Sequence, residues 1–401
     1  MITSLYGKNT FYILTSSLIG YVGLTTIPRA TVLILAIPVF WTLADSRYAA
    51  FIVMLAYKLT ASRGLLPGAA VFLSEDHTLL QAATLYFLMS FGVSLPFLIF
   101  WSEDRKKKAV CLIFAFMITY ILPPISLIGI INPLMATGTI FKSYGFAGIL
   151  IILAIYALCA VSIKTAYVFL CVIALFAVLP GDDWHKPIKP EGIIAFDTSF
   201  GKLGSGSFNF TQDYERANMV FSELRKHGIS KIEENIIILP ETIAGRLNKT
   251  GLELWSNEIQ KLLPNSNKTV VFGAELPTSD GRKYDNAMIL LHDGKTSAIN
   301  QRIPVPYSMY RGPFAKTGAR LHLLDNGILA LPDGRRAAVI ICYEAFLAWP
   351  YIASMTNSPG VIICSANLWW CKDTSLPMTM KTVVSLWALT FGVPVVFAWN
   401  I

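Results

Sequence analysis

Charge is scarce in this chain: Asp, Glu, Lys and Arg make up only 14% of its 401 residues, whereas they make up roughly 25% of ordinary soluble domains. The shortage is concentrated before residue 181, where long apolar runs alternate with short polar breaks. From Gly181 onward, charged residues, glycine and turn residues return at globular density. We therefore predict two domains, a membrane domain over residues 1–181 and a globular domain over residues 182–401.

Several functional motifs are also missing. The chain has no CxxC pair, and its five histidines are scattered without the spacing of metal ligands. We therefore expect no metal and no cofactor. The second domain has no basic run interleaved with aromatic residues, so nucleic acid is not an expected partner. Cys364 and Cys371 could pair with each other, which would leave Cys342 as the odd thiol of that domain.

The apolar runs of the first domain predict membrane-spanning helices, each of which needs about 20 largely apolar residues. Seven candidates occur, and six or eight remain alternatives because some are short. The candidate spans cover residues 11–27, 30–44, 48–59, 79–101, 109–131, 144–163 and 165–179.

A basic loop predicts the orientation of these spans. Arg105-Lys106-Lys107-Lys108 lies between the fourth and fifth spans, and positive loops face the cytoplasm. Counting forward places the second domain in the periplasm of a bacterium, attached to a multi-pass inner-membrane anchor. The net charge of +8 fits contact with anionic membrane lipids, although a solvated surface would give the same total.

Two apolar segments of the second domain each end in a reactive side chain. Val339-Ile340-Ile341 precedes Cys342, and Ile236-Ile237-Ile238-Leu239 precedes Pro240-Glu241, 101 residues earlier (342 − 241). The carboxyl ends of strands in an open α/β sheet are where such folds build their sites. A thiol and a carboxylate placed there are suited to act as a nucleophile and its base.

Strand and helix patterns alternate through the second domain, which predicts an α/β fold with both sheet faces covered. The expected strands cover residues 192–197, 235–239, 269–275, 284–292, 337–341, 360–365 and 394–399, and the expected helices cover residues 210–227, 250–263 and 378–391.

Three segments resemble the signature blocks of the nitrilase (carbon–nitrogen hydrolase) superfamily: Leu239-Pro240-Glu241, Ile341-Cys342-Tyr343-Glu344 and Asn367-Leu368-Trp369-Trp370. With apolar spans ahead of them, the chain is similar in plan to the apolipoprotein N-acyltransferases. The finer match is to the TraB-type conjugal-transfer membrane proteins. It is carried by the segments 240–246, Tyr284-Asp285-Asn286-Ala287 and Arg302-Ile303-Pro304-Val305-Pro306.

The resemblance implies an α-β-β-α sandwich with a Glu–Lys–Cys triad, in which Glu241 is the general base and Cys342 the nucleophile. The backbone N–H of Tyr343 would then stabilise an oxyanion. The lysine is expected five residues before Pro306, where this chain has Gln301 (306 − 5). The neighbouring Arg302 could supply the charge, but a shift of one residue along a strand turns the side chain to the opposite face.

Other matching positions have supporting roles or structural ones. Glu344 is a candidate second carboxylate near the site, or a turn residue. Asn367 and Trp370 belong to the third signature block, and the tryptophan would line an acyl groove or fill the core. Cys342 could also be a buried core residue, and Glu241 a helix N-terminal charge.

We interpret the chain as an acyltransferase or amidase that forms a thioester at Cys342 and acts on a lipid or a lipidated peptide. The alternative is an inactive nitrilase-fold protein that serves as a binding or assembly component in conjugation or the cell envelope, which Gln301 favours. A transporter ranks last because the centres of the apolar runs are nearly free of charge. The conjugal setting rests on the TraB-type resemblance alone.

Overall fold

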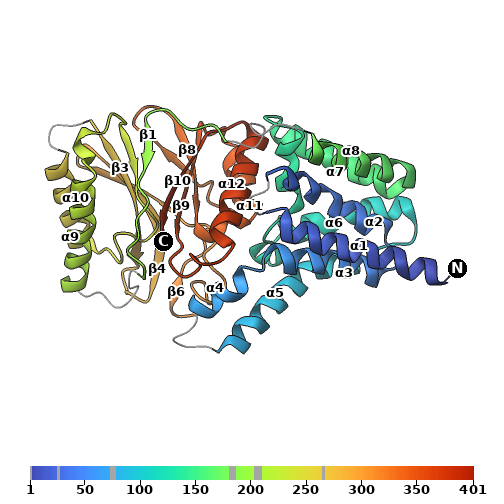
Figure 1. Ribbon diagram of the computed structural model, residues 1–401. Coiled ribbons are helices and arrows are strands. Elements are labelled where there is room, and N and C mark those ends of the chain that lie inside the picture. The colour runs from blue at the N-terminus through green and yellow to red at the C-terminus, as the bar shows by residue number, and fades with distance from the viewer. Residues whose placement is uncertain (1, 25–27, 73–77, 180–186, 203–209, 264–266) are drawn as a thin grey trace. The chain divides into compact units, whose positions relative to one another are not determined.

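The computed structural model describes residues 2–24, 28–72, 78–179, 187–202, 210–263 and 267–401 (Figure 1). The chain divides into two compact units. The helical unit comprises Met1–Pro187, Phe346–Trp349 and Cys371–Val393, and the α/β unit comprises Ile188–Ala345, Pro350–Trp370 and Pro394–Ile401. The predicted boundary at residues 180–183 lies outside the described residues.

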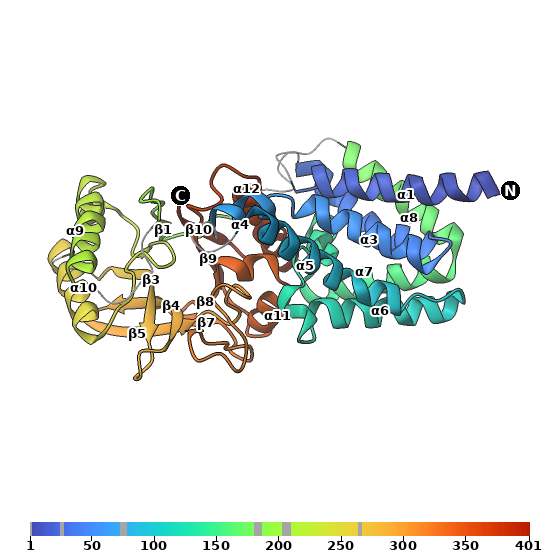
Figure 2. The same ribbon diagram turned by 90° about the horizontal axis from the view of Figure 1, so that it is seen from below.

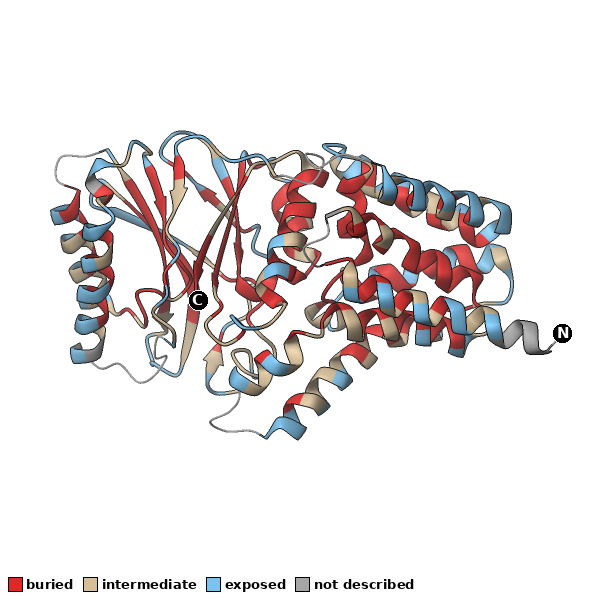
Figure 3. Cartoon of the chain, viewed as in Figure 1, coloured by how far each residue is buried: buried red, intermediate tan, exposed pale blue. Residues whose placement is uncertain are grey.

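The helical unit is built from short helices that pack side by side. Its elements are α1 (Ile2–Val22), η1 (Pro28–Ala36), α2 (Ile37–Leu43), α3 (Arg47–Ala61), α4 (Leu65–Phe72), α5 (Leu79–Ile99), α6 (Arg105–Tyr120), η2 (Ile125–Ile128), η3 (Pro133–Thr139), α7 (Gly145–Val161), α8 (Ile163–Val178) and α12 (Leu376–Phe391). Helix α3 packs against both α1 and α5, and α6 packs against α7. Figure 3 shows that most of these helices bury one side and expose the other.

The prediction of a polytopic membrane domain is wrong. Among the described residues, α5 is the one helix that is both long and apolar enough to cross a bilayer. Helices α3 and α4 meet that test only together, and they are bent by 57° at their junction. Helices α7 and α8 are apolar but contain 17 and 16 residues, fewer than the roughly 20 that a span needs.

Helix breakers explain why the apolar runs do not become long helices. The expected span at 109–131 ends as a helix at Tyr120, shortly before Pro123 and Pro124, and proline cannot continue a helix because it lacks the N–H donor. Pro38 likewise stands near the start of the short helix α2. Between α7 and α8, the Ser162 side chain accepts a hydrogen bond from the Thr165 backbone N–H at 3.2 Å and so begins a new helix.

The α/β unit contains a six-stranded mixed sheet in the order β1-β2-β3-β4-β5, with β6 paired to β4. Its strands are β1 (Ile193–Ala195), β2 (Ile236–Ile238), β3 (Thr269–Pro277), β4 (Lys283–His292), β5 (Lys295–Asn300) and β6 (Gly318–Ala319). The pairs β1–β2 and β2–β3 are parallel, whereas β3–β4 and β4–β5 are antiparallel hairpins. Helices α9 (Phe210–Lys226) and α10 (Lys249–Leu262) cover one face of this sheet (Figures 1 and 2).

A second sheet of four strands has the order β10-β9-β8-β7. It consists of β7 (Ile328–Ala330), β8 (Arg336–Ile341), β9 (Val361–Asn367) and β10 (Val395–Asn400), and the short elements η6 (Cys342–Phe346) and α11 (Trp349–Met355) follow β8. A hydrogen bond links the two sheets: the Ser365 hydroxyl of β9 donates to the carbonyl of Leu239, directly after β2, at 3.3 Å. The apolar cluster between the first sheet and its helices centres on Phe221, Trp255 and Phe272.

Candidate active site

Cys342 and Glu241 meet at the ends of two strands from different sheets. Cys342 follows β8 directly and has a positive φ of 50°, a conformation that is unusual for a residue with a side chain. Such strain at a strand-to-helix turn is often found at functional sites. Glu241 follows β2 and is succeeded by Thr242, which also has a positive φ, of 52°. The Cys342 thiol and the Glu241 carboxylate form a hydrogen bond.

The environment of Glu241 suits a general base. Its side chain is 3% exposed, and this burial raises the pKa of the carboxyl. Three hydrogen bonds oppose the effect by favouring the ionised form: those from Cys342, from the Asn286 side chain at 2.6 Å and from the Asn367 backbone N–H at 2.8 Å. The carboxylate is therefore held in a fixed geometry, with a pKa above its ordinary value.

The side chains of Asn286 and Gln301 link Glu241 to the residue before Cys342 through hydrogen bonds. Asn286 Nδ2 donates to Glu241 Oε1 and also to Gln301 Oε1, the latter at 2.9 Å. Gln301 Nε2 donates to the carbonyl of Ile341, the residue before Cys342, at 2.9 Å. Gln301 therefore lies in the place where the resemblance expects a lysine. Sequence reasoning missed Asn286 as a site residue, although it belongs to the quoted Tyr284-Asp285-Asn286-Ala287 block.

Arg302 forms a buried ion pair with Glu344. The guanidinium is 0% exposed and its Nη2 lies 3.0 Å from Glu344 Oε2. It also donates to the carbonyls of Val339 and Pro350 at 2.7 and 2.9 Å and to the Ser354 hydroxyl at 2.7 Å. Within the described residues Glu241 has no ion pair, so the Arg302 charge is used to brace the fold and not to pair with the base.

Glu344 extends this brace to the backbone around the site. Its Oε1 accepts the N–H groups of Arg302 and Ile303, and its Oε2 accepts the N–H of Ile341 at 3.2 Å. Glu344 therefore ties the segment that carries Gln301 to the end of β8, which carries Cys342. Its charge is also one of the groups that raise the pKa of Glu241, after the larger effect of burial.

Three further predicted site residues, Asn367, Trp370 and Tyr343, differ in how they relate to Cys342 and Glu241. Asn367 contributes its backbone N–H to Glu241 and its side chain to the Thr242 hydroxyl at 2.9 Å. The Trp370 indole donates to the Asn367 carbonyl at 3.1 Å. Tyr343 is buried, which raises the pKa of its phenol, and its backbone follows the nucleophile directly.

The cysteines differ in their surroundings. None of the six cysteines forms a disulfide, so Cys364 and Cys371 do not pair with each other. Burial is the first cause of a raised pKa at both thiols, to about 12 at Cys371 and beyond that at Cys364. Both thiols therefore ionise less readily than an exposed cysteine, whereas the Cys342 thiol is hydrogen-bonded to the Glu241 carboxylate. Within the described residues, no three His, Cys, Asp or Glu side chains gather as a metal site.

Asp285, next to Asn286, anchors the loop that carries β6. Its carboxylate pairs with Arg320 and with His322 Nε2, the latter at 2.7 Å. Burial raises the pKa of this carboxyl, but the hydrogen bonds from His322 and Arg320 outweigh it and hold the pKa at about 2. The contacts of Asp285 with Arg320 and His322 hold residues 318–322 against β4, the strand that also contains Asn286.

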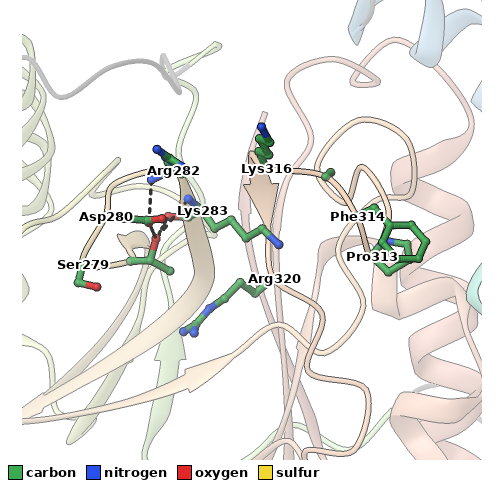
Figure 4. A pocket seen from close by; sticks show the side chains of 10 residues that line it. Ser279, Asp280, Arg282, Lys283, Pro313, Phe314, Lys316 and Arg320 are labelled. Carbon is green, nitrogen blue, oxygen red and sulfur yellow. Dashed lines mark hydrogen bonds between the residues drawn. The ribbon is translucent and has the colours of Figure 1, made fainter.

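A shallow basic pocket of about 700 Å³ lies at the turn between β3 and β4 (Figure 4). Four cationic side chains line it, against one carboxylate: Arg282, Lys283, Lys316, Arg320 and Asp280. Neither Cys342 nor Glu241 lines this pocket. Phe314 stands at its rim with 97% of its surface exposed. The pocket therefore favours an anionic ligand with an apolar part.

The chain is 31% identical to the conjugal transfer protein TraB of Agrobacterium fabrum, in an alignment that covers 97% of this chain and 92% of the relative. The chain belongs to the TraB family. It is also 27% identical to the probable conjugal transfer protein TraB of Sinorhizobium fredii, with 96% of each chain covered. The predicted TraB-type resemblance is thus confirmed.

Solved structures similar to this TraB-family chain include an amidase of the nitrilase superfamily from Nesterenkonia. The identity is 12% and the TM-score 0.38, with 53% of this chain and 79% of the amidase covered. A glutamine-dependent NAD⁺ synthetase from Acinetobacter baumannii is similar over 43% of this chain and 32% of its own, at 11% identity and a TM-score of 0.30. No protein-family model matches the chain.

Proposed function

We propose that this TraB-family protein is a cysteine-dependent acyltransferase or amidase. The observation that carries the proposal is the hydrogen bond between the Cys342 thiol and the buried Glu241 carboxylate, at the ends of β8 and β2. A thiol is mostly protonated at neutral pH, so it needs an adjacent base to become a nucleophile. The signature blocks that resemble the nitrilase superfamily contain both residues.

In the proposed reaction Cys342 Sγ attacks the carbonyl carbon of an amide or ester, and its proton passes to Glu241. The tetrahedral intermediate collapses: the C–N or C–O bond breaks, the leaving group takes the proton from Glu241, and a thioester remains. An amine or water then attacks the thioester and gives its proton to Glu241. The C–S bond breaks and the thiolate regains the proton.

The oxyanion of each tetrahedral intermediate needs donors, because the site replaces the expected lysine by Gln301. We propose the backbone N–H of Tyr343 for this role. Asn286, whose amide already bonds the base, keeps Glu241 oriented for each proton transfer. Arg302 was the candidate cation, but its bonds to Glu344 give it a positioning role.

For the substrate we propose a lipid or lipidated peptide. Although neither Cys342 nor Glu241 lines it, the basic pocket with the exposed Phe314 is suited to contact an amphipathic anion away from the reacting carbonyl. Exposed leucines on the helical unit support contact with membrane lipids, among them Leu14, Leu150 and Leu158 at 58–65% exposure. Localisation at the bacterial inner membrane stays a prediction. A periplasmic location of the α/β unit likewise stays a prediction.

The test is to incubate the purified full-length protein with a p-nitrophenyl ester of a medium-chain fatty acid and to locate the acyl adduct by peptide mass spectrometry. We expect the adduct on Cys342, and at least tenfold less on Cys364 and Cys371. Cys342→Ala should abolish the adduct, whereas the matched Cys364→Ala should keep it. An adduct spread evenly over the three thiols, or none at all, would reject the enzyme.

The second candidate is an inactive member that serves as a binding component in conjugation, the setting named for both relatives. Gln301 in the lysine position favours it, since the described site lacks a cation. Plasmid transfer frequency separates the two functions. Cys342→Ala at normal protein level should lower transfer as much as gene deletion if thioester chemistry is needed, and should leave it unchanged if the fold alone is needed.

A further inference from the structure

Glu275 is a second buried carboxyl on the face of the sheet that holds the site. It lies in β3 directly opposite Asn286 of β4, and directly opposed residues of antiparallel strands share a face. Gly273 lies two residues earlier in β3, on the same face. A Cβ added to Gly273 would lie 2.5 Å from the Cα of Glu241. Glu275 therefore lies on the side of β3 that contacts the base.

Two acceptors in this place have no donor. Glu275 is 6% exposed, and within the described part of the chain no hydrogen bond or ion pair engages its carboxylate. Asn286 is 2% exposed, and its Oδ1 is buried without a partner because both of its bonds use Nδ2. An unsatisfied buried acceptor such as Asn286 Oδ1 is costly, so this acceptor and the neighbouring Glu275 carboxylate are suited to a ligand that brings N–H donors.

Three charged side chains act on Glu275. Burial is the main cause that raises its pKa to about 7, the charge of Glu241 raises it further, and Arg246 and Arg216 lower it. Tyr284 faces the same region, since Glu275 and Glu241 both raise the pKa of its phenol after burial. Tyr284 is half-buried.

The two arginines are occupied elsewhere. The Arg246 guanidinium donates to the Gly281 carbonyl at 3.0 Å and lies 5.8 Å from the centre of the Tyr284 ring. Arg216 pairs with Asp213 at 3.3 Å. Neither bonds Glu275, so the carboxylate can bind a cation of the substrate.

We propose that Glu275 and Asn286 Oδ1 bind the primary amino group of the acyl acceptor, with Glu275 as a positioning residue beside the Cys342–Glu241 pair. An ammonium or amine offers at least two N–H donors, one for each acceptor. The assignment rests on the proposed function and narrows it, because it makes the second substrate an amine.

Binding can be measured apart from catalysis in full-length protein carrying Cys342→Ala. The probe is ethylammonium, titrated by ligand-observed NMR, and the comparison ligand is tetramethylammonium, which has the charge but no N–H. We expect saturable binding of ethylammonium, at least tenfold weaker binding of tetramethylammonium, and at least tenfold weaker ethylammonium binding after Glu275→Gln. The matched surface change Glu253→Gln should shift the affinity less than twofold.

The pH dependence gives a readout that a merely structural role would not move. Ethylammonium binding should tighten between pH 6 and pH 8 as Glu275 ionises, and should become flat over that range after Glu275→Gln. Glu275→Asp, which keeps the charge, should recover part of the affinity. Equal binding by the Glu275→Gln protein, equal binding of tetramethylammonium, or no binding of ethylammonium overturns the proposal. Because Cys342 is absent, failure of the thioester chemistry leaves these results unaffected.

Discussion

Replacement of Arg302 by methionine should destabilise the end of β8 more than any surface change. Methionine has a similar length but no charge, so Arg302→Met leaves the Glu344 carboxyl at 1% exposure without its cation. It also removes the donors that now satisfy the carbonyls of Val339 and Pro350. The site then loses the brace that joins the Gln301 segment to Cys342.

The magnitude follows from the burial of both partners. Breaking a fully buried ion pair by removing one partner costs about 3–5 kcal/mol, because the remaining charge stays out of water. That range corresponds to roughly a hundred-fold to several-thousand-fold in an opening equilibrium. Exchange of the Glu344 carboxylate for an amide should relieve part of the loss, so Arg302→Met with Glu344→Gln should be less destabilised than the sum of the single changes.

Hydrogen–deuterium exchange of a peptide that contains β8 measures this opening locally. We expect exchange in Arg302→Met to be faster by at least a hundred-fold. The matched control is Arg335→Met, which breaks the partly exposed pair with Asp333 and should cost less than about 1 kcal/mol. If β8 in Arg302→Met exchanges within threefold of the wild type, the buried pair does not hold the site and the reasoning fails.

Three further changes test other parts of the site. Gly273→Ala places a Cβ against the backbone of Glu241. The change should lower the free energy of unfolding by about 1–3 kcal/mol and slow the acylation of Cys342 more than tenfold. Unchanged urea unfolding and acylation would contradict the close packing. Gln301→Lys supplies a cation that stabilises a thiolate, so it should raise the rate at which iodoacetamide labels Cys342 at pH 7 roughly tenfold. Equal labelling rates would contradict the position assigned to Gln301 beside the site. Asp285→Asn should lower the melting temperature at pH 6–7 but not near pH 2. The pKa of the Asp285 carboxyl is about 2, below the ordinary ~3.9, so its ionised form stabilises the fold above pH 4 and this contribution is lost as the pH falls toward 2. A difference in melting temperature that does not depend on pH would contradict this.

The ends of the buried strands were predictable because local pattern decides them. Apolar runs that end in one polar residue correctly indicated β2 and β8. By contrast β5 was missed, because Lys295–Asn300 is largely exposed and lacks an apolar face.

Features that depend on distant segments could not be read in advance. Asn286 and Glu275 face the site only because β3 and β4 pair in one register. The partner that captures Arg302 comes from η6, 42 residues away. The apolar runs of the first half misled for a related reason: composition gave them the hydropathy of spans, but prolines and a serine cap divide them into shorter helices.

The account depends on Glu241 taking the proton of Cys342. The direct measurement is the second-order rate constant for acylation of Cys342 by the p-nitrophenyl ester at pH 7, in the wild type and in Glu241→Gln. General-base catalysis contributes about 10²–10⁴-fold, so the account predicts that Glu241→Gln is slower by at least a hundred-fold while Glu253→Gln matches the wild type. Rate constants within threefold of each other for the wild type and Glu241→Gln would contradict it.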